Sequence, residues 1–357
     1  MNSFPKIVVW AESGLALLLL AGTSCSVTRV QQTKKVANKE AESFEKLRKA
    51  AEQGDATAQT RIGLAYCQGS VQPIDNTEAE RWWRKAADEG NIQAQKCLGG
   101  AYFLNQLGMP HDDAEAARWY RKAADQGDAE GQFILGGNYE TGEGVSRDMS
   151  AATNWYRRAA NQGYLQAQSR LGWLYFMKQN FQDAAYWNRK AADQGDAFAQ
   201  TILGSQYYQG QGVRQDYAEA ARWHRKAADQ GNASAQTSLG FQYCQGQGVR
   251  QDYDEAARWY LKAADHGDPL AQSYLGSMYL LGQGVLQDYV EAYKWLNIAA
   301  ASSKLIFPGI QKNFSRQRDF VASKMTTGQI AEAQRLSREW KPQKQAAIPL
   351  RSDHQKD

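Results

Sequence analysis

The pattern of apolar and polar positions repeats along most of the chain. Residues 216–249 read DYAEAARWHRKAADQGNASAQTSLGFQYCQGQGV, and nearly the same text returns 36 residues later at 252–285. A fixed period of this size is typical of stacked supersecondary units. We therefore expect one elongated array in which each unit contacts mainly its neighbours.

Each repeat predicts a helical hairpin, whose first helix follows a glycine. In six of the seven repeats the residue after that glycine is Asp or Asn, a good helix N-cap. Small or apolar residues then recur every four positions, as Ala235, Leu239 and Tyr243 do, which marks one face of a helix. Gly240 lies inside the same helix, where a glycine costs ~1 kcal/mol relative to alanine. We expect another helix to approach at this glycine. The repeat glycines are Gly54, Gly90, Gly127, Gly163, Gly195, Gly231 and Gly267.

The second helix begins at an Asp or Asn, and in most repeats Glu follows three residues later, which is capping-box spacing. A tryptophan stands seven residues beyond each cap, and small residues such as Ala220 and Ala227 flank it. This alternation predicts that each tryptophan fills the space between stacked helices. An aromatic ladder that binds a ligand is the alternative. The seven are Trp82, Trp119, Trp155, Trp187, Trp223, Trp259 and Trp295.

Both ends of the array depart from the repeat. Residues 39–53 match the second half of a repeat and predict an N-terminal capping helix. Residues 302–340 predict two further amphipathic helices, at 311–324 and 329–340, that cap the other end. The fold class is therefore an all-α superhelical solenoid of seven hairpins over 39–301, with capping helices at both ends. Residues 341–357 are polar and are expected to be disordered.

The first 25 residues have the layout of a secretory signal. One lysine precedes an apolar run, GLALLLLA at 14–21, and small residues lead to Cys25. The run is shorter than the ~20 residues that cross a membrane. We expect residues 1–25 to direct export to the cell envelope or periplasm, with 26–38 as a linker. A retained anchor, or a cytoplasmic scaffold with an apolar N-terminal helix, stays open.

The end of this segment resembles a bacterial lipoprotein signal. The resemblance implies that Cys25 is lipidated and tethers the solenoid to a membrane. Ser24 fits this pattern, whereas Gly22 stands where a branched aliphatic residue is usual.

The LGxxY, GxGV, DxxEAxxW and KAADQG segments closely resemble Sel1-like repeats, relatives of the tetratricopeptide repeat. The match covers residues 40–301, and seven copies agree. The resemblance implies that the first helices line a concave surface that binds other proteins. Aromatic residues off the core stripe of those helices are the candidate anchors, because sister repeats hold polar or small residues there. They are Phe133, Trp173, Phe198 and Phe241. For Trp173 the alternative is that it fills space left by the short connection in its repeat.

Charge and metal-ligand spacing exclude several classes of function. The net charge is only +4, and acids match the bases of the repeats nearby. No uncompensated basic surface for nucleic acid is expected. The four histidines lie in different contexts without a second ligand at metal spacing, so neither a metal nor a cofactor is expected. His224 and His266 replace Tyr and Gln of other repeats, which suits exposed positions.

The remaining candidate chemistry is sparse. Cys67, Cys97 and Cys244 are expected to be free, largely buried thiols. Ser43 and Lys46 have the S-x-x-K spacing of a penicillin-recognising nucleophile, but no S-D-N or K-T-G follows. Chance explains this spacing better. The chain is therefore predicted to be a non-enzymatic adaptor, and a cell-wall or β-lactam-related hydrolase is the alternative.

Overall fold

The computed structural model describes residues 42–69, 73–104, 111–303 and 308–342. Every regular element in these ranges is an α-helix, and they contain no strand. The predicted all-α architecture is confirmed. The predicted signal at 1–25 with Cys25, the linker at 26–38 and residues 343–357 of the tail lie outside the described part.

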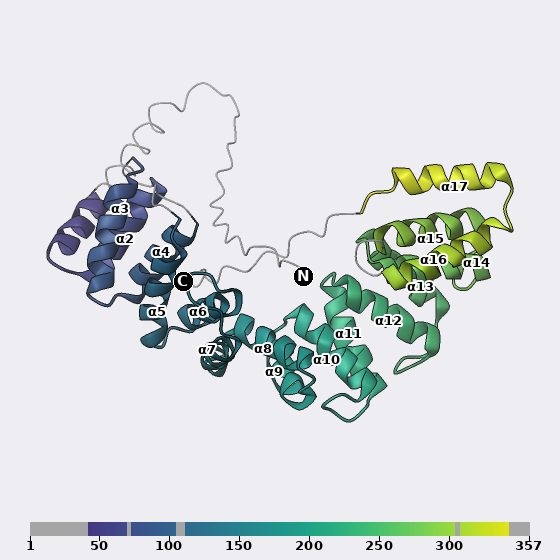
Figure 1. Cartoon of the computed structure of the whole chain (residues 1–357), viewed down its shortest axis with the longest axis horizontal. Helices are drawn as coiled ribbons and strands as arrows, with labels where there is room; N and C mark the ends of the chain where they lie inside the picture. Colours follow the sequence, from purple (N-terminus) through teal and green to yellow (C-terminus); the bar gives the residue numbers. More distant parts are fainter. Residues whose placement is uncertain (1–41, 70–72, 105–110, 304–307, 343–357) are drawn as a thin grey trace, which may run out of the picture. The chain divides into compact units, whose positions relative to one another are not determined.

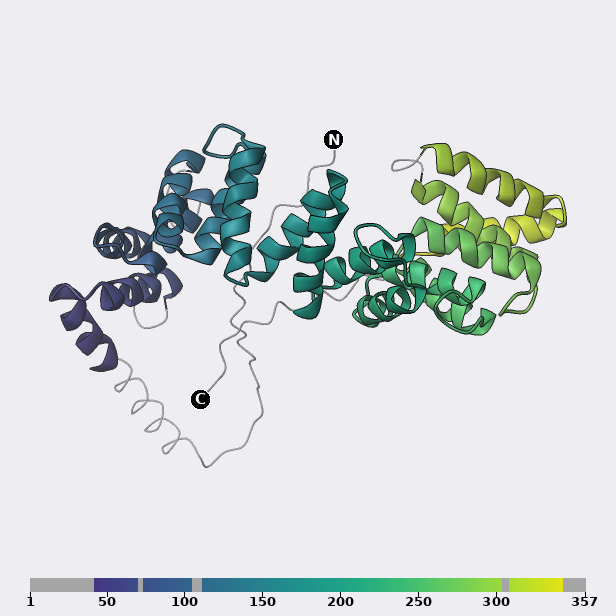
Figure 2. The ribbon, with the colours of Figure 1, turned by 90° about the horizontal axis from the view of Figure 1, so that it is seen from below.

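The chain divides into two compact units, Met1–His111 and Asp112–Asp357. In both, first and second helices alternate along the sequence (Figures 1 and 2). A helix at 42–52 precedes them. The first helices are α2 (Ala56–Gln68), α4 (Ile92–Phe103), α6 (Ala129–Thr141), α8 (Leu165–Met177), α10 (Ala197–Gln209), α12 (Ala233–Gln245) and α14 (Pro269–Leu281). The second helices are α3 (Asn76–Asp88), α5 (Asp113–Asp125), α7 (Met149–Asn161), α9 (Phe181–Asp193), α11 (Tyr217–Asp229), α13 (Tyr253–Asp265) and α15 (Tyr289–Ser303).

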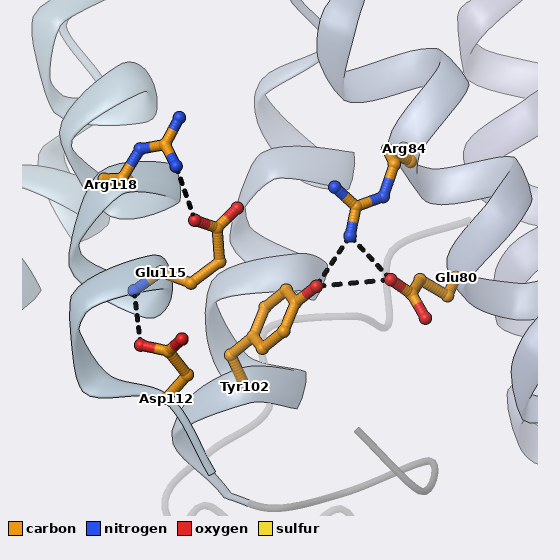
Figure 3. Close-up of polar contacts among 6 residues, drawn as sticks. All are labelled: Glu80, Arg84, Tyr102, Asp112, Glu115 and Arg118. Atoms are coloured by element: carbon orange, nitrogen blue, oxygen red, sulfur yellow. Dashed lines mark hydrogen bonds and ion pairs between the residues drawn. The ribbon is translucent and has the colours of Figure 1, made fainter. Parts of the chain in front are cut away.

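Short polar side chains begin the helices where the sequence predicted caps. Asn232 accepts a hydrogen bond from the Ala235 N–H at 3.0 Å at the start of α12. Asp112 does the same for the Glu115 N–H at 2.9 Å (Figure 3). Among the first helices α2 to α14, α8 alone begins without a side-chain cap, because Tyr164 occupies the cap position.

The capping box predicted for the second helices is only half present. The Asp216 carboxylate accepts from the Glu219 N–H, but the Glu219 carboxylate pairs with Arg222. The Asp216 N–H is already used, because it donates to the Tyr207 carbonyl at 2.9 Å. The acid three residues into the helix therefore has no donor to reach back to. Figure 3 shows the same forward pair between Glu115 and Arg118, 2.7 Å apart.

The mid-helix glycines lie where a second helix approaches. A Cβ built on Gly240 would meet the Tyr260 ring at 2.8 Å, and one on Gly204 would meet the His224 ring at 2.5 Å. The approaching side chain is in each case the residue after the repeat tryptophan. His224 is thus 2% exposed, and the predicted exposed position is wrong. The imidazole takes the place of a buried Tyr ring over the glycine.

The repeat tryptophans fill the core, as predicted. Trp223 is 2% exposed and belongs to a cluster with Leu203 and Ala199. Trp155 is the exception, since it is only half-buried. In five of the seven repeats a basic residue three positions after the tryptophan covers the ring, as at Trp223, whose ring centroid lies 4.1 Å from the Lys226 ammonium.

A buried glutamine joins each first helix to the preceding second helix. Gln236 Nε2 donates to the Ala228 carbonyl, eight residues earlier, at 3.1 Å. The same bond recurs in the other repeats at 3.0–3.2 Å, from Gln59, Gln95, Gln132, Gln168, Gln200 and Gln272. Each of these carbonyls lies near a helix C-terminus and also accepts from the N–H of the next repeat glycine, so the glutamine amide supplies its second hydrogen bond.

Two helices follow the repeats, α16 (Pro308–Ala322) and α17 (Thr327–Glu339). They pack on α15, where Val321 and Ala333 join Leu296 in one buried cluster. Beyond α17, the Trp340 ring meets the Trp295 ring edge-on with centroids 6.0 Å apart.

Candidate functional site

Charge is distributed unevenly between the two kinds of helix in unit Asp112–Asp357. None of α10, α12 and α14 contains an Asp, Glu, Lys or Arg. The second helix α11, by contrast, reads YAEAARWHRKAAD. These three first helices therefore present a neutral surface and the second helix α11 a charged one, whereas the first helices α6 and α8 of the same unit carry Glu130, Glu140 and Arg170.

An aromatic strip crosses these neutral helices. It consists of Tyr208 on α10, Phe241 on α12 and Tyr274 on α14. The ring centroids of Tyr208 and Phe241 lie 6.3 Å apart, and those of Phe241 and Tyr274 lie 6.2 Å apart. Both distances are within the range of favourable aromatic pairs. One contiguous chain of rings thus joins three successive hairpins.

Two further aromatic rings pack against the two ends of the aromatic strip. Tyr217 contacts Tyr208, and Tyr260 contacts Tyr274, each with centroids 5.1 Å apart. Tyr260 is 1% exposed and anchors the strip to the core. Tyr274 itself is 37% exposed, and Phe241 and Tyr208 are half-buried. The strip is therefore a fixed surface that solvent and a ligand can reach.

The phenols of the strip are neutral groups. Partial burial raises the pKa of Tyr208 and of Tyr274, and the negative charge of Asp268 contributes for Tyr274. The Tyr208 hydroxyl donates to the amide oxygen of Gln247. Leu270 stands one helical turn before Tyr274 and is 42% exposed. Among these neighbours of the strip, Asp268 is thus the one charged residue, and the others are apolar or uncharged.

The four predicted anchors occupy three different environments. Phe241 is the centre of the strip, while Phe198 stands 47% exposed on α10. Phe133 lies against Tyr156 and Tyr164, with centroids 5.4 Å from each. Burial raises the pKa of Tyr164 to about 12.

Trp173 is half-buried against the cluster around Leu171 and Tyr156. The Arg170 guanidinium lies 4.6 Å from its ring centroid and also pairs with Glu140. These contacts agree with the space-filling alternative for Trp173.

Sequence reasoning missed Tyr208 and Tyr274. A signal existed for Tyr274, because the seventh residue after the repeat glycine is Arg61, Ile202 or Ser238 in sister repeats. Tyr274 is therefore an aromatic residue at a position where these repeats have none, which is the criterion that identified Phe241. Tyr208 was hidden beside Tyr207, the regular tyrosine of the repeat.

The other candidate chemistry does not assemble into a site. Ser43 is exposed, and the Lys46 ammonium pairs with Glu42 at 3.5 Å rather than with Ser43. In the described part of the chain, no three His, Cys, Asp or Glu side chains are grouped to hold a metal ion. None of its helices is both long and apolar enough to span a bilayer. Cys67, Cys97 and Cys244 form no disulfide bond in the described part of the chain, as predicted, but they are only half-buried.

The fold and its repeated contacts define the class of the protein. The Sel1 repeat model matches residues 42–55, 56–91, 93–128, 129–164, 165–196, 197–232, 233–268 and 269–303. The chain belongs to the Sel1 repeat family. The partial match at 42–55 is the half-repeat expected at the N-terminus.

Two solved structures have sequences about one-third identical to this chain. One is a protective antigen present in uropathogenic Escherichia coli strains, which displays an SLR fold. It is 33% identical, with 84% of this chain and 71% of that chain covered and a TM-score of 0.56. The other is a Sel1 repeat protein from Oxalobacter formigenes, 32% identical over 68% of this chain and 96% of that one, with a TM-score of 0.57. No curated protein matches the chain.

Proposed function

We propose that this Sel1 repeat protein is a non-enzymatic adaptor that holds partner proteins on the first helices of its repeats. Sel1 repeat proteins are generally protein-interaction scaffolds. The observation that carries the proposal is the aromatic strip of Tyr208, Phe241 and Tyr274, which spans three hairpins on charge-free helices. Exposed aromatic side chains that the core fixes in place are favourable anchors, because they lose little side-chain entropy on binding.

The direct test is affinity capture from the native host with the wild-type chain and the Phe241→Ala/Tyr274→Ala variant. We expect the variant to lose partners that the wild-type chain retains. Tyr186→Ala is the matched control, because Tyr186 is a 53% exposed aromatic on the second helix α9. Circular dichroism establishes that each variant is folded. A folded double variant that captures the same partners would contradict the proposed surface.

Export to the cell envelope is the second part of the proposal. Its support is the signal-like layout of residues 1–25 and the resemblance of Cys25 to a lipidation site. Metabolic labelling with a fatty acid, followed by fractionation, tests this. Label that disappears in Cys25→Ser supports the lipoprotein, label-free protein in the periplasm supports soluble export, and cytoplasmic protein contradicts both.

The hydrolase alternative gains no support from the described residues. Its only sequence signal was Ser43 with Lys46, and these side chains are exposed on the helix at 42–52. Incubation with a labelled β-lactam is the check, and we expect no stoichiometric acylation of Ser43.

A further inference from the structure

Two serine hydroxyls on the neutral face of α10, α12 and α14 donate their proton to a backbone carbonyl of their own helix. Ser238 occupies the repeat position of Tyr274, and Ser277 occupies that of Phe241, so both lie on the face of the aromatic strip. The Ser238 hydroxyl donates to the Ser234 carbonyl at 2.9 Å, and the Ser277 hydroxyl donates to the Ser273 carbonyl at 3.0 Å.

These bonds leave the two hydroxyls as acceptors only. A serine hydroxyl has one proton and two lone pairs, and here the helix backbone takes the proton. Both side chains are half-buried rather than covered. A ligand on this face must therefore supply the donors.

The absence of ionised side chains on these three helices also limits the charge that a ligand can carry. The three helices contain no ionised side chain, and the Asp268 carboxylate at the start of α14 already accepts the Ala271 N–H, so this face offers little to compensate a charge that loses water on binding. Burying an unpaired charge costs far more than burying an apolar group. Leu270 and Phe198, 42% and 47% exposed, add apolar surface beside the strip.

We propose that this face binds an extended, uncharged peptide segment of a partner protein. Its aromatic or aliphatic side chains pack on the aromatic strip, and its backbone N–H groups donate to the Ser238 and Ser277 hydroxyls. An extended peptide carries free N–H donors along its length, which a helix does not. This inference rests on the proposed adaptor function and names the partner chemistry for the same surface.

The test is selection of peptides from a random phage-displayed library on the full chain. We expect the enriched sequences to be rich in aromatic and aliphatic residues and free of charge. The affinity of a selected synthetic peptide should change less than about twofold between 50 and 500 mM NaCl, because no ion pair is screened. Methylation of single backbone nitrogens should weaken binding where an N–H is donated.

Three variants assign the binding to this face. Phe241→Ala/Tyr274→Ala should weaken the selected peptide at least about tenfold, as expected for central anchors. Ser238→Lys places a charge on the face at a half-exposed position and should weaken it comparably. Ala218→Lys, at an exposed position of the second helix α11, is the matched charge control and should leave binding unchanged.

The outcomes separate this inference from the function on which it rests. Enriched peptides with a shared charged motif, or binding that weakens steeply with salt, would overturn the uncharged ligand and leave the adaptor standing. Strip-dependent binding on an array of neutral oligosaccharides, without peptide enrichment, would replace the peptide with a glycan. Peptides that bind Phe241→Ala/Tyr274→Ala as tightly as the wild type would contradict the surface itself.

Discussion

In unit Asp112–Asp357, the α9–α10 and α11–α12 steps meet through polar contacts, whereas the α7–α8 and α13–α14 steps on either side of them meet through apolar contacts. At the α9–α10 step, Asn188 Nδ2 donates to Gln206 Oε1 at 3.0 Å. At the α11–α12 step, His224 Nδ1 lies 2.8 Å from Gln242 Oε1. All four side chains are at most 2% exposed. The amide nitrogens of these glutamines donate to the carbonyls of Phe181 and Tyr217, the first residues of α9 and α11, so both ends of each amide are used.

The flanking steps fill the equivalent positions with apolar groups. Tyr156 shares a cluster with Leu174, and Tyr260 shares one with Met278. In every case the partner stands 18 residues after the side chain that covers the glycine. At these four steps the stacking position holds a hydrogen-bonded pair or an apolar pair, whereas at the α5–α6 step the equivalent buried residues are Tyr120 and Asn138. A mixed pair whose members do not bond to each other would bury a polar group without that partner, which is costly.

The largest expected effect comes from breaking one polar pair. Gln242→Leu removes the partner of the buried His224 and also the hydrogen bonds that Gln242 donates to the Tyr217 and Gln247 carbonyls. We expect the free energy of unfolding to fall by about 3 kcal/mol. Urea unfolding followed by tryptophan fluorescence measures it. Met278→Leu at the equivalent apolar position is the control and should cost less than about 1.5 kcal/mol. Equal losses would contradict the comparison.

Converting the polar step into an apolar one is the second test. His224→Tyr with Gln242→Met copies the Tyr260–Met278 pair of the neighbouring hairpin. We expect each single variant to be destabilised and the double variant to recover, with a coupling energy of about 1–2 kcal/mol in a double-mutant cycle. Additive losses would show that the two positions are not matched to each other.

Of the stacking pairs at these four steps, only the α11–α12 pair contains a histidine, so we expect it to make the stability depend on pH. Burial lowers the pKa of His224, and the hydrogen bonds to Gln242 and to the Thr201 carbonyl only partly oppose it. Above the unfolded pKa of about 6.5, both states are neutral and the fold is fully stable. Below it the unfolded chain binds the proton first, so stability falls, by at most ~1.4 kcal/mol per pH unit for one proton.

The measurement is the melting temperature between pH 7.5 and pH 5. The wild-type chain should lose more than His224→Tyr, which has no imidazole to titrate in this core. Parallel curves for the two proteins would exclude His224 as the source.

The smallest effect is expected at Ser205. Its oxygen lies 3.5 Å from His224 Nε2, at the limit of a hydrogen bond, while its proton goes to the Thr201 carbonyl at 3.0 Å. Ser205→Ala should therefore change the free energy of unfolding by less than about 0.5 kcal/mol. A loss comparable to that of Gln242→Leu would place Ser205 inside the polar pair.

Much of the fold could be read from the repeat because its signals are local. Caps such as Asn232, the mid-helix glycine Gly240 and the buried Trp223 each follow from spacing within one hairpin. The prediction that His224 is exposed was wrong because it was based on the variation of residue type at this position between repeats. The position is buried in all of them, and the partner that permits a polar ring, Gln242, belongs to the next hairpin.

The candidate site was only partly predictable for the same reason. Phe241 was predicted because other repeats have polar or small residues at its position. The aromatic strip, however, also needs the rings of Tyr208 and Tyr274 beside it. Tyr208 and Tyr274 stand 33 residues before and after Phe241, at different positions of their own repeats. Only stacking of α10, α12 and α14 brings the Phe241 ring within 6.3 Å of Tyr208 and 6.2 Å of Tyr274.

The sequence by itself therefore determined the hairpin, its caps and the residues that face inward, because helix periodicity and capping act over a few residues. The tertiary structure decided which side chains of different repeats meet. It turned Phe133 and Trp173 toward their own core clusters, and it placed Phe241 between Tyr208 and Tyr274. Those contacts depend on how one hairpin packs on the next, and the sequence pattern within one hairpin does not determine the distance between side chains of two hairpins.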